Sequence, residues 1–203
     1  PTVTSEQLNL DKQTFANVLR QSRRGLSAGH SGQRNEFLKP CLEDDISFDL
    51  LHEVASRLAR ADVPGTVSHA MRVSKLSALL KPNGRVRGIS AGEVFRRLVA
   101  KTLSRQFQGQ FRAIIGPANF GLCDRSGTDA LAHLIDFMTE EDPELVILSI
   151  DGVGAFDHVC RTRFFEQLEA APDLQCLLPF VHQWYAHPSE FRWRDAAGVV
   201  HTI

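Results

Sequence analysis

Apolar residues recur at helical spacing along much of the chain. In residues 11–20, Phe15, Val18 and Leu19 fall on one face, and Asp11 stands where an N-cap is expected. The same reasoning predicts helices over residues 11–20, 47–61, 91–107, 126–138, 161–170 and 172–186. The positions expected to face inward on the second and fourth of these are Leu50, Leu51, Val54, Leu58, Leu131, Leu134 and Ile135.

Two stretches predict β-hairpins. In residues 76–90, two short runs flank Asn83-Gly84, and Asn-Gly favours a type I′ turn with positive φ at both central residues. Because successive side chains of a strand point to opposite faces, Arg85 and Arg87 are expected on the face opposite Val86. The second hairpin is expected over residues 191–203, with its turn at residues 195–198.

The run from Leu145 to Ile150 is almost wholly apolar and predicts a buried strand that ends at Asp151. A carboxylate there could cap a helix or accept bonds from loop amides. It could also bind a hard cation, since Mg²⁺ is held by one or two carboxylates together with substrate phosphates. The small residues Gly152 and Gly154 would let the backbone approach a ligand closely, and Phe156 adds an aromatic wall.

The chain has 203 residues and a net charge of −1, but its charge is uneven. Between Lys81 and Arg112, eight basic residues stand against Glu93 alone, which gives +7 over this stretch and leaves −8 for the rest. On the predicted helix of residues 91–107, the cations lie mostly opposite the apolar face; they are Arg96, Arg97, Lys101 and Arg105. This surface either binds a phosphate-bearing partner or is a solvated face paired with acids elsewhere.

Helices with hairpins and one central strand, without strict βαβ order, predict an α+β fold. The four cysteines are far apart and show no zinc or disulfide spacing, which favours an intracellular protein. No apolar run is long enough to span a bilayer, so no membrane is expected as a partner. The N-terminal residues do not have the pattern of a signal peptide.

Four segments, in order, resemble motifs of reverse transcriptases of the non-LTR retrotransposon type. SIDGVGAFDHV (149–159) resembles the first catalytic motif, and KPNGRVRGIS (81–90) resembles the fingers hairpin. NFGLCDRSGTDALAHLI (119–135) resembles the segment between them, and SRRGLSAGHSGQRNEFL (22–38) resembles a degenerate form of the motif that precedes the fingers. The resemblance implies a right-hand polymerase: residues 1–143 mainly fingers and the start of the palm, residues 144–203 the first palm strand, helices and a hairpin.

The resemblance also implies roles for individual residues. Asp151 matches the catalytic, metal-binding Asp, and the carbonyl of Gly152 would be a second ligand of Mg²⁺ or Mn²⁺. Phe156 would lie against the sugar of the incoming deoxynucleotide. Lys81, Arg85 and Arg87 would hold the triphosphate, for which arginine has suitable bidentate geometry. Nucleic-acid contacts would come from the helical cations Arg96, Arg97, Lys101 and Arg105.

The implied partners are an RNA template, a DNA primer, deoxynucleoside triphosphates and the rest of the polymerase, in the nucleus. The family's second carboxylate pair, aromatic-x-Asp-Asp, does not follow Asp157 in this sequence. We therefore expect fragment-like behaviour, with no two-metal turnover by the 203-residue chain alone. Two alternatives stay open: a non-catalytic nucleic-acid-binding remnant of a retroelement, and a metal-dependent phosphatase or nuclease built around Asp151. Trp184, Trp193 and Phe191 could stack on bases or pack within the fold.

Overall fold

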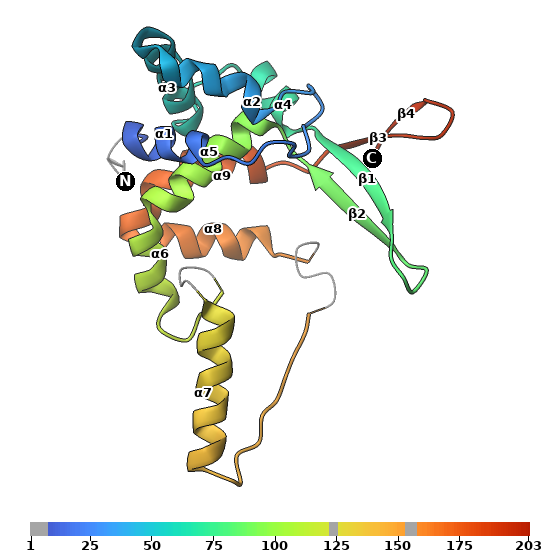
Figure 1. The fold of residues 1–203 in the computed structure, drawn as a ribbon. Coiled ribbons are helices and arrows are strands. Elements are labelled where there is room, and N and C mark those ends of the chain that lie inside the picture. Colours follow the sequence, from blue (N-terminus) through green and yellow to red (C-terminus); the bar gives the residue numbers. More distant parts are fainter. Residues whose placement is uncertain (1–7, 122–125, 153–157) are drawn as a thin grey trace.

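The computed structural model describes residues 8–121, 126–152 and 158–203, and it combines many helices with a small mixed sheet (Figure 1). The helices are α1 (Lys12–Arg20), α2 (Asn35–Leu38), the 3₁₀ helix η1 (Lys39–Glu43), α3 (Asp45–Ala59), α4 (Gly65–Arg72), α5 (Val94–Gln106), α6 (Gln108–Ile115), α7 (Gly127–Glu141), α8 (Arg161–Glu169), the 3₁₀ helix η2 (Pro172–Leu177) and α9 (Leu178–Tyr185). The strands are β1 (Ser74–Leu80), β2 (Val86–Ala91), β3 (Phe191–Arg194) and β4 (Val200–Thr202). The expected α+β class is confirmed.

The core lies where α1, α3, α5 and α9 pack together, with α8 and η2 beside them. Phe15 and Leu19 of α1 and Val99 of α5 are fully buried there. Each such side chain contributes about 1.5–3 kcal/mol by leaving water. Because α9 also contacts α3 and α4, the C-terminal helices belong to the same packed body as the N-terminal ones. The division of function near residue 143 stays a prediction.

Side-chain caps fix the starts of two core helices. The Asp11 carboxylate accepts a hydrogen bond from the Thr14 N–H at 2.6 Å, as expected from the sequence. The Asp44 carboxylate caps α3 by accepting from the Ser47 N–H at 2.7 Å. The helix expected at residues 47–61 therefore begins two residues earlier, because Asp44 supplies the cap.

The sheet joins the two predicted hairpins in the order β2-β1-β3-β4. β1 pairs antiparallel with β2, and β3 pairs antiparallel with β4. β1 and β3 are parallel and overlap only at Ser74–Phe191 and Lys75–Arg192. The two hairpins therefore leave a common base and diverge as separate arms (Figure 1).

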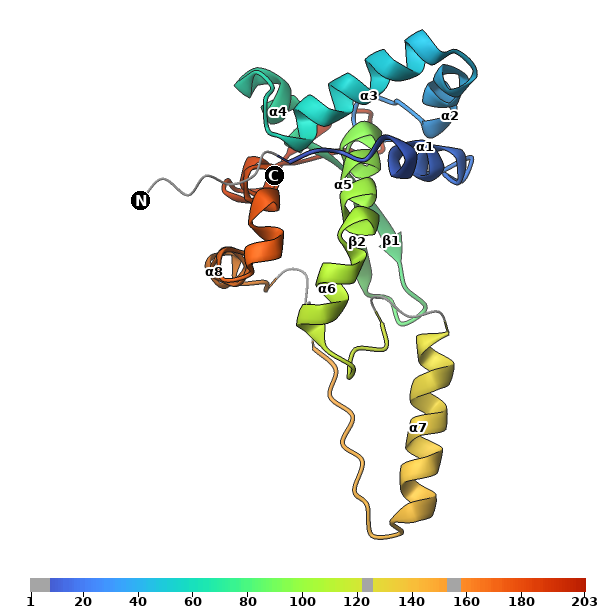
Figure 2. The same ribbon diagram turned by 90° about the vertical axis from the view of Figure 1, so that its left-hand side faces the viewer.

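A third projection consists of α7 and the extended chain that follows it, which leave the packed body together (Figures 1 and 2). The burial expected for α7 is wrong: Leu131 and Leu134 are each 40% exposed, and Ile135 is half-buried. Exposure is also higher than expected on α3, where Leu58 is buried but Leu50 and Val54 lie largely in solvent. The helical period was predicted correctly, but on α7 no element in the described chain covers the apolar face.

Candidate nucleic-acid and nucleotide site

The β1–β2 hairpin brings together the three cations expected to hold a triphosphate. The register pairs Leu79 with Arg87, and the Lys81 N–H continues it by donating to the Arg85 carbonyl oxygen at 2.8 Å. Directly paired residues of antiparallel strands share a face. Lys81, Arg85 and Arg87 therefore lie on one face of the hairpin, as alternation predicted for the two arginines. Arg85 and Arg87 are exposed and Lys81 is half-buried.

The turn of this hairpin is not of the expected type I′. Gly84 has a φ of +77°, whereas Asn83 does not have positive φ. Pro82 is the reason, since its ring fixes φ near −65° and makes it suitable for the second position of a type I turn. The Gly84 N–H donates to the Lys81 carbonyl at 2.9 Å, and the Asn83 side chain accepts from the Arg85 N–H at 3.2 Å. The turn is thus fixed by Pro82 and Gly84 together.

The four cations of α5 are not equivalent. The guanidinium of Arg96 lies over the ring of Trp184, with Cζ 4.6 Å from the ring centroid. Burial lowers the pKa of Arg96, and Tyr185 partly offsets the effect. Arg96 therefore lies against the packed body, and the helical pattern alone could not reveal its partner 88 residues away.

The other three cations lie toward the N-terminal segment. Arg97 donates to the Ser27 carbonyl, and Arg105 donates to the Gln21 side chain at 2.7 Å. Lys101 is exposed and, with Arg97, lines a small cavity of about 200 Å³ between α5 and α1. Of the four residues, Lys101 is the one whose charge is most available to a ligand, while Arg97 and Arg105 also position the preceding loop.

Glu93 anchors that loop and was missed as a site residue in the sequence. Its carboxylate is buried, accepts from the Ser31 N–H at 2.9 Å and from the Ser31 hydroxyl at 2.5 Å, and lies under Gly29. A Cβ at Gly29 would come within 2.7 Å of the Glu93 Cα, so the loop approaches α5 as closely as a glycine allows. The sequence did carry a signal, since Glu93 is the single acid among eight bases.

Beside this loop lies a larger, mainly apolar cavity of about 460 Å³. Leu51 and Val54 of α3, Met71 of α4 and Phe95 of α5 form its apolar wall, and His30 and Glu93 lie at its polar side. The incomplete burial of Val54 follows from this hollow.

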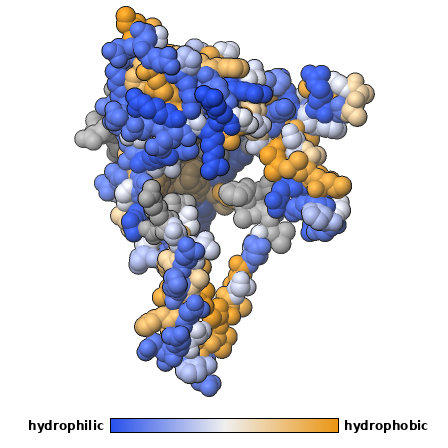
Figure 3. Space-filling view, in the orientation of Figure 1, coloured by the Kyte–Doolittle hydropathy of each residue, from blue (hydrophilic) through white to orange (hydrophobic). Residues whose placement is uncertain are grey.

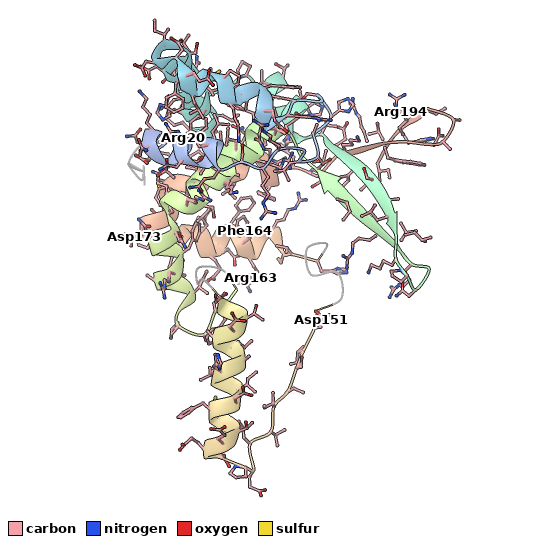
Figure 4. The ribbon with its side chains drawn as sticks, in the orientation of Figure 1. Arg20, Asp151, Arg163, Phe164, Asp173 and Arg194 are labelled. Atoms are coloured by element: carbon pink, nitrogen blue, oxygen red, sulfur yellow. The ribbon has the colours of Figure 1, made fainter. Side chains whose placement is uncertain are left out.

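The segment that precedes Asp151 is not the buried strand expected from the sequence. Residues 145–150 form no strand in the structure; Leu145 is half-buried and the residues after it are exposed, with Val146 87% and Ile150 83% accessible. A strand needs a neighbour for its N–H and C=O groups, and none of the described residues pairs with this segment. Asp151 lies at the end where the segment returns toward the packed body (Figure 4). Asp151 and Gly152 are both exposed, whereas Phe156 and Asp157 lie outside the described residues.

The donor atoms at Asp151 are of the kind that binds a hard cation. A carboxylate and the Gly152 carbonyl are oxygen ligands of the type that Mg²⁺ prefers. Within the described ranges, no three His, Cys, Asp or Glu side chains come together as a metal-binding group. Two-metal chemistry would require carboxylates in addition to Asp151.

The β3–β4 hairpin contains an arrangement that the sequence did not suggest. The Trp193 and His201 rings are a cross-strand pair, stacked with centroids 4.5 Å apart. His201 Nε2 lies 2.8 Å from the Asp195 carboxylate, which also accepts from the Val199 N–H at 2.9 Å. These hydrogen bonds, that of His201 most strongly, lower the pKa of Asp195. Trp193 thus stiffens the hairpin, while Trp184 is buried and Phe191 half-buried.

Comparison with models of known protein families gives no match, and comparison of the sequence with curated proteins gives none either. No helix in residues 8–121, 126–152 or 158–203 combines the length and apolar character needed to cross a membrane.

Proposed function

We propose that the chain carries the fingers and the beginning of the palm of an RNA-directed DNA polymerase of the non-LTR retrotransposon type. The observation that supports this proposal best is the β1–β2 hairpin, which gathers Lys81, Arg85 and Arg87 on one face. Three cations on one side of a short ribbon suit the triphosphate of an incoming nucleotide, because guanidinium groups bind phosphate in a bidentate manner. The assignment of the family rests on the motif resemblance.

In this proposal Asp151 is the catalytic carboxylate, and its exposure makes it accessible to a substrate. Lys101 contacts the backbone of the RNA template or the DNA primer. Arg97 and Arg105 do the same while they hold the loop of residues 22–34. The metal, the position of Phe156 against the nucleotide sugar and the nuclear location stay predictions from the resemblance.

The decisive experiment is primer extension on an RNA template with a DNA primer and Mg²⁺. The protein used should contain the chain together with the reading frame that follows Ile203 in its transcript. We expect Asp151→Asn to abolish extension while leaving the dissociation constant for the RNA–DNA hybrid unchanged. Asp173→Asn is the matched control, since Asp173 lies on η2 at a distance from Asp151 (Figure 4). Extension by the Asp151 variant would refute the catalytic role.

A second candidate is nucleic-acid binding without turnover. It is favoured by the contrast between the cations, which are gathered on the hairpin, and the carboxylates, which do not form a metal-binding group within the described ranges. Binding by the 203-residue chain without extension by the longer protein would support this candidate over the polymerase. Its affinity should fall steeply with salt, because bound cations release counterions from the phosphates.

A further inference from the structure

The sheet register extends the cationic face of the β1–β2 hairpin across a third strand. Lys75 is paired with Ala91, so it shares a face with Arg87 and Arg85. Across the parallel junction, Lys75 lies opposite Arg192, and alternation along β3 places Arg194 on the same side. One sheet face therefore carries six basic residues from both arms, which are Lys75, Lys81, Arg85, Arg87, Arg192 and Arg194. We call this set the cationic sheet face.

The opposite face has a different character. In the described strands it has no lysine or arginine: it carries Leu76, Ala78, Leu80 and Val86 on the first arm and Trp193, His201 and Asp195 on the second. The cations share their own face with Leu79 and Ile89. On the cationic sheet face, Glu190 is the one acid within the described part of the chain. Its carboxylate forms an ion pair with the Arg192 guanidinium at 3.1 Å, and its second oxygen lies 3.8 Å from His69 Nε2. The positive charge is thus segregated to one side and is neutralised at only one position.

The two arms are held in shape by the same turn design. In the first arm, the Lys81 N–H donates to the Arg85 carbonyl, and the Gly84 N–H donates to Lys81. In the second arm, Asp195 and Val199 form the equivalent pair, and Gly198 has a φ of +85°. The Arg194 guanidinium donates to the Gly198 carbonyl at 2.9 Å, which holds this side chain beside its turn. Both arms therefore present cations from short, well-defined hairpins.

Like charges face each other directly at two places on this surface. Lys81 is opposite Arg85, and Lys75 is opposite Arg192, whose charge is partly offset by Glu190. Directly opposed like charges destabilise a sheet. A bound polyanion would remove that cost, whereas a face with only a structural role would gain from mixed charges. The exposed cations Lys75, Arg85, Arg87 and Arg194 remain accessible to such a ligand.

We propose that Lys75, Arg192 and Arg194 of the cationic sheet face bind the sugar–phosphate backbone of a nucleic-acid strand, beside the Lys81, Arg85 and Arg87 side chains that the proposed polymerase uses for the triphosphate. Recognition is through phosphate charge and is independent of base sequence. The inference rests on nucleic acid as the partner in the proposed function and extends the phosphate-binding surface from the first hairpin to the second. The Lys75–Arg192 junction lets one strand contact both arms.

The test is fluorescence anisotropy of a labelled 20-nucleotide single-stranded RNA, repeated with single-stranded DNA, over a series of salt concentrations. The test variant is Lys75→Gln/Arg194→Gln, which removes two exposed cations and leaves the Glu190–Arg192 pair intact. The control is Arg57→Gln/Arg163→Gln, which removes the same charge from exposed ion pairs on α3 and α8. Thermal unfolding of each variant checks that the fold is retained.

We expect about tenfold weaker binding by the test variant, for RNA and DNA alike, and a salt dependence shallower by about 1.4 log units per log unit, since each contact to a single strand contributes about 0.7. The control should bind like the wild type. Unchanged binding by the test variant, or an equal loss in the control, would overturn the inference and leave the proposed polymerase untouched. A wild-type chain that binds neither strand would overturn both the inference and the nucleic-acid partner on which it rests.

Discussion

The guanidinium of Arg96 lies over the indole of Trp184 at 4.6 Å, so a side chain expected to contact nucleic acid is part of the packing between α5 and α9. A cation on an aromatic face contributes about 0.5–2 kcal/mol, depending on desolvation, and the arginine stem adds apolar contact. Arg96→Ala should therefore lower the free energy of unfolding by about 1–2 kcal/mol, measured by denaturant titration.

Lys101→Ala is the contrasting variant on the same helix. Lys101 is exposed, so its removal should leave stability within about 0.5 kcal/mol of the wild type and weaken binding of single-stranded RNA. The opposite pattern, with Arg96→Ala affecting binding alone and Lys101→Ala affecting stability, would show that Arg96 contacts the nucleic acid directly.

Glu93 should be the key residue for the loop of residues 22–34. Its carboxylate accepts two hydrogen bonds from Ser31, and Glu93→Ala leaves the partly buried Ser31 N–H without a partner. An unsatisfied donor of this kind costs about 1–3 kcal/mol. We expect that loss in denaturant titration, together with faster proteolysis within the loop.

The control for Glu93 is Glu53→Ala on α3. Glu53 is exposed and pairs with the half-buried Arg60 at 3.6 Å, and surface ion pairs contribute about 0–1 kcal/mol. Equal losses in the two variants would mean that the Glu93–Ser31 hydrogen bonds do not hold the loop.

Gly29→Ala tests the close approach of the same loop to α5. The added Cβ would lie 2.7 Å from the Glu93 Cα, so the backbone must move, and the melting temperature should fall by several degrees. Gly109→Ala is the matched change in α6, where no atom lies within 4 Å of the new Cβ. Alanine is favoured over glycine in a helix by about 0.5–1 kcal/mol, so this variant should be more stable than the wild type. A Gly29 variant with an unchanged melting temperature would contradict the close packing.

The Asp195 carboxylate should make the second hairpin sensitive to acid. Its pKa is below the usual 3.8, chiefly because of the hydrogen bond from His201. A carboxyl group with a lowered folded-state pKa stabilises the fold above its unfolded pKa, and this contribution is lost as the pH falls through the folded value. The Val199 amide, which donates to Asp195, should therefore shift in NMR spectra as the pH is lowered, with a midpoint below 3.8.

Asp195→Asn keeps an oxygen acceptor but removes the titrating group. The acid-induced shift of the Val199 resonance should disappear in this variant. A shift that persists would assign the titration to another group.

Where local signals decided the structure, the sequence predicted it well. Asp11 caps α1 as expected, and both hairpins form where turn residues separate short runs. The type I′ turn was wrong because Pro82 has no N–H to pair with Arg85 and its own φ suits the second position of a type I turn, which places the turn at residues 81–84. The cations of the first hairpin were placed correctly because strand alternation is a local property.

Features that depend on distant partners could not be predicted. Trp184 covers Arg96, and Ser31 contacts Glu93, across 88 and 62 residues of sequence respectively. The strand expected at residues 145–150 failed for the same reason, because an apolar run becomes a strand only beside another strand. The cationic sheet face needed the β1–β3 register, which joins residues 74–75 to 191–192.

The exposed run at residues 146–150 also affects the solubility expected of the protein. It is a short, uncharged segment without proline in which Ser149 is the one polar residue, and no strand of the described chain pairs with it. Figure 3 shows apolar surface gathered on the projection that this run forms with α7. Such segments can stack into cross-β assemblies with the same segment of other chains. This run should therefore limit the solubility of the chain. Leu148, which is 79% exposed, is a suitable position to change, and Leu148→Lys should raise the solubility without loss of the helical core.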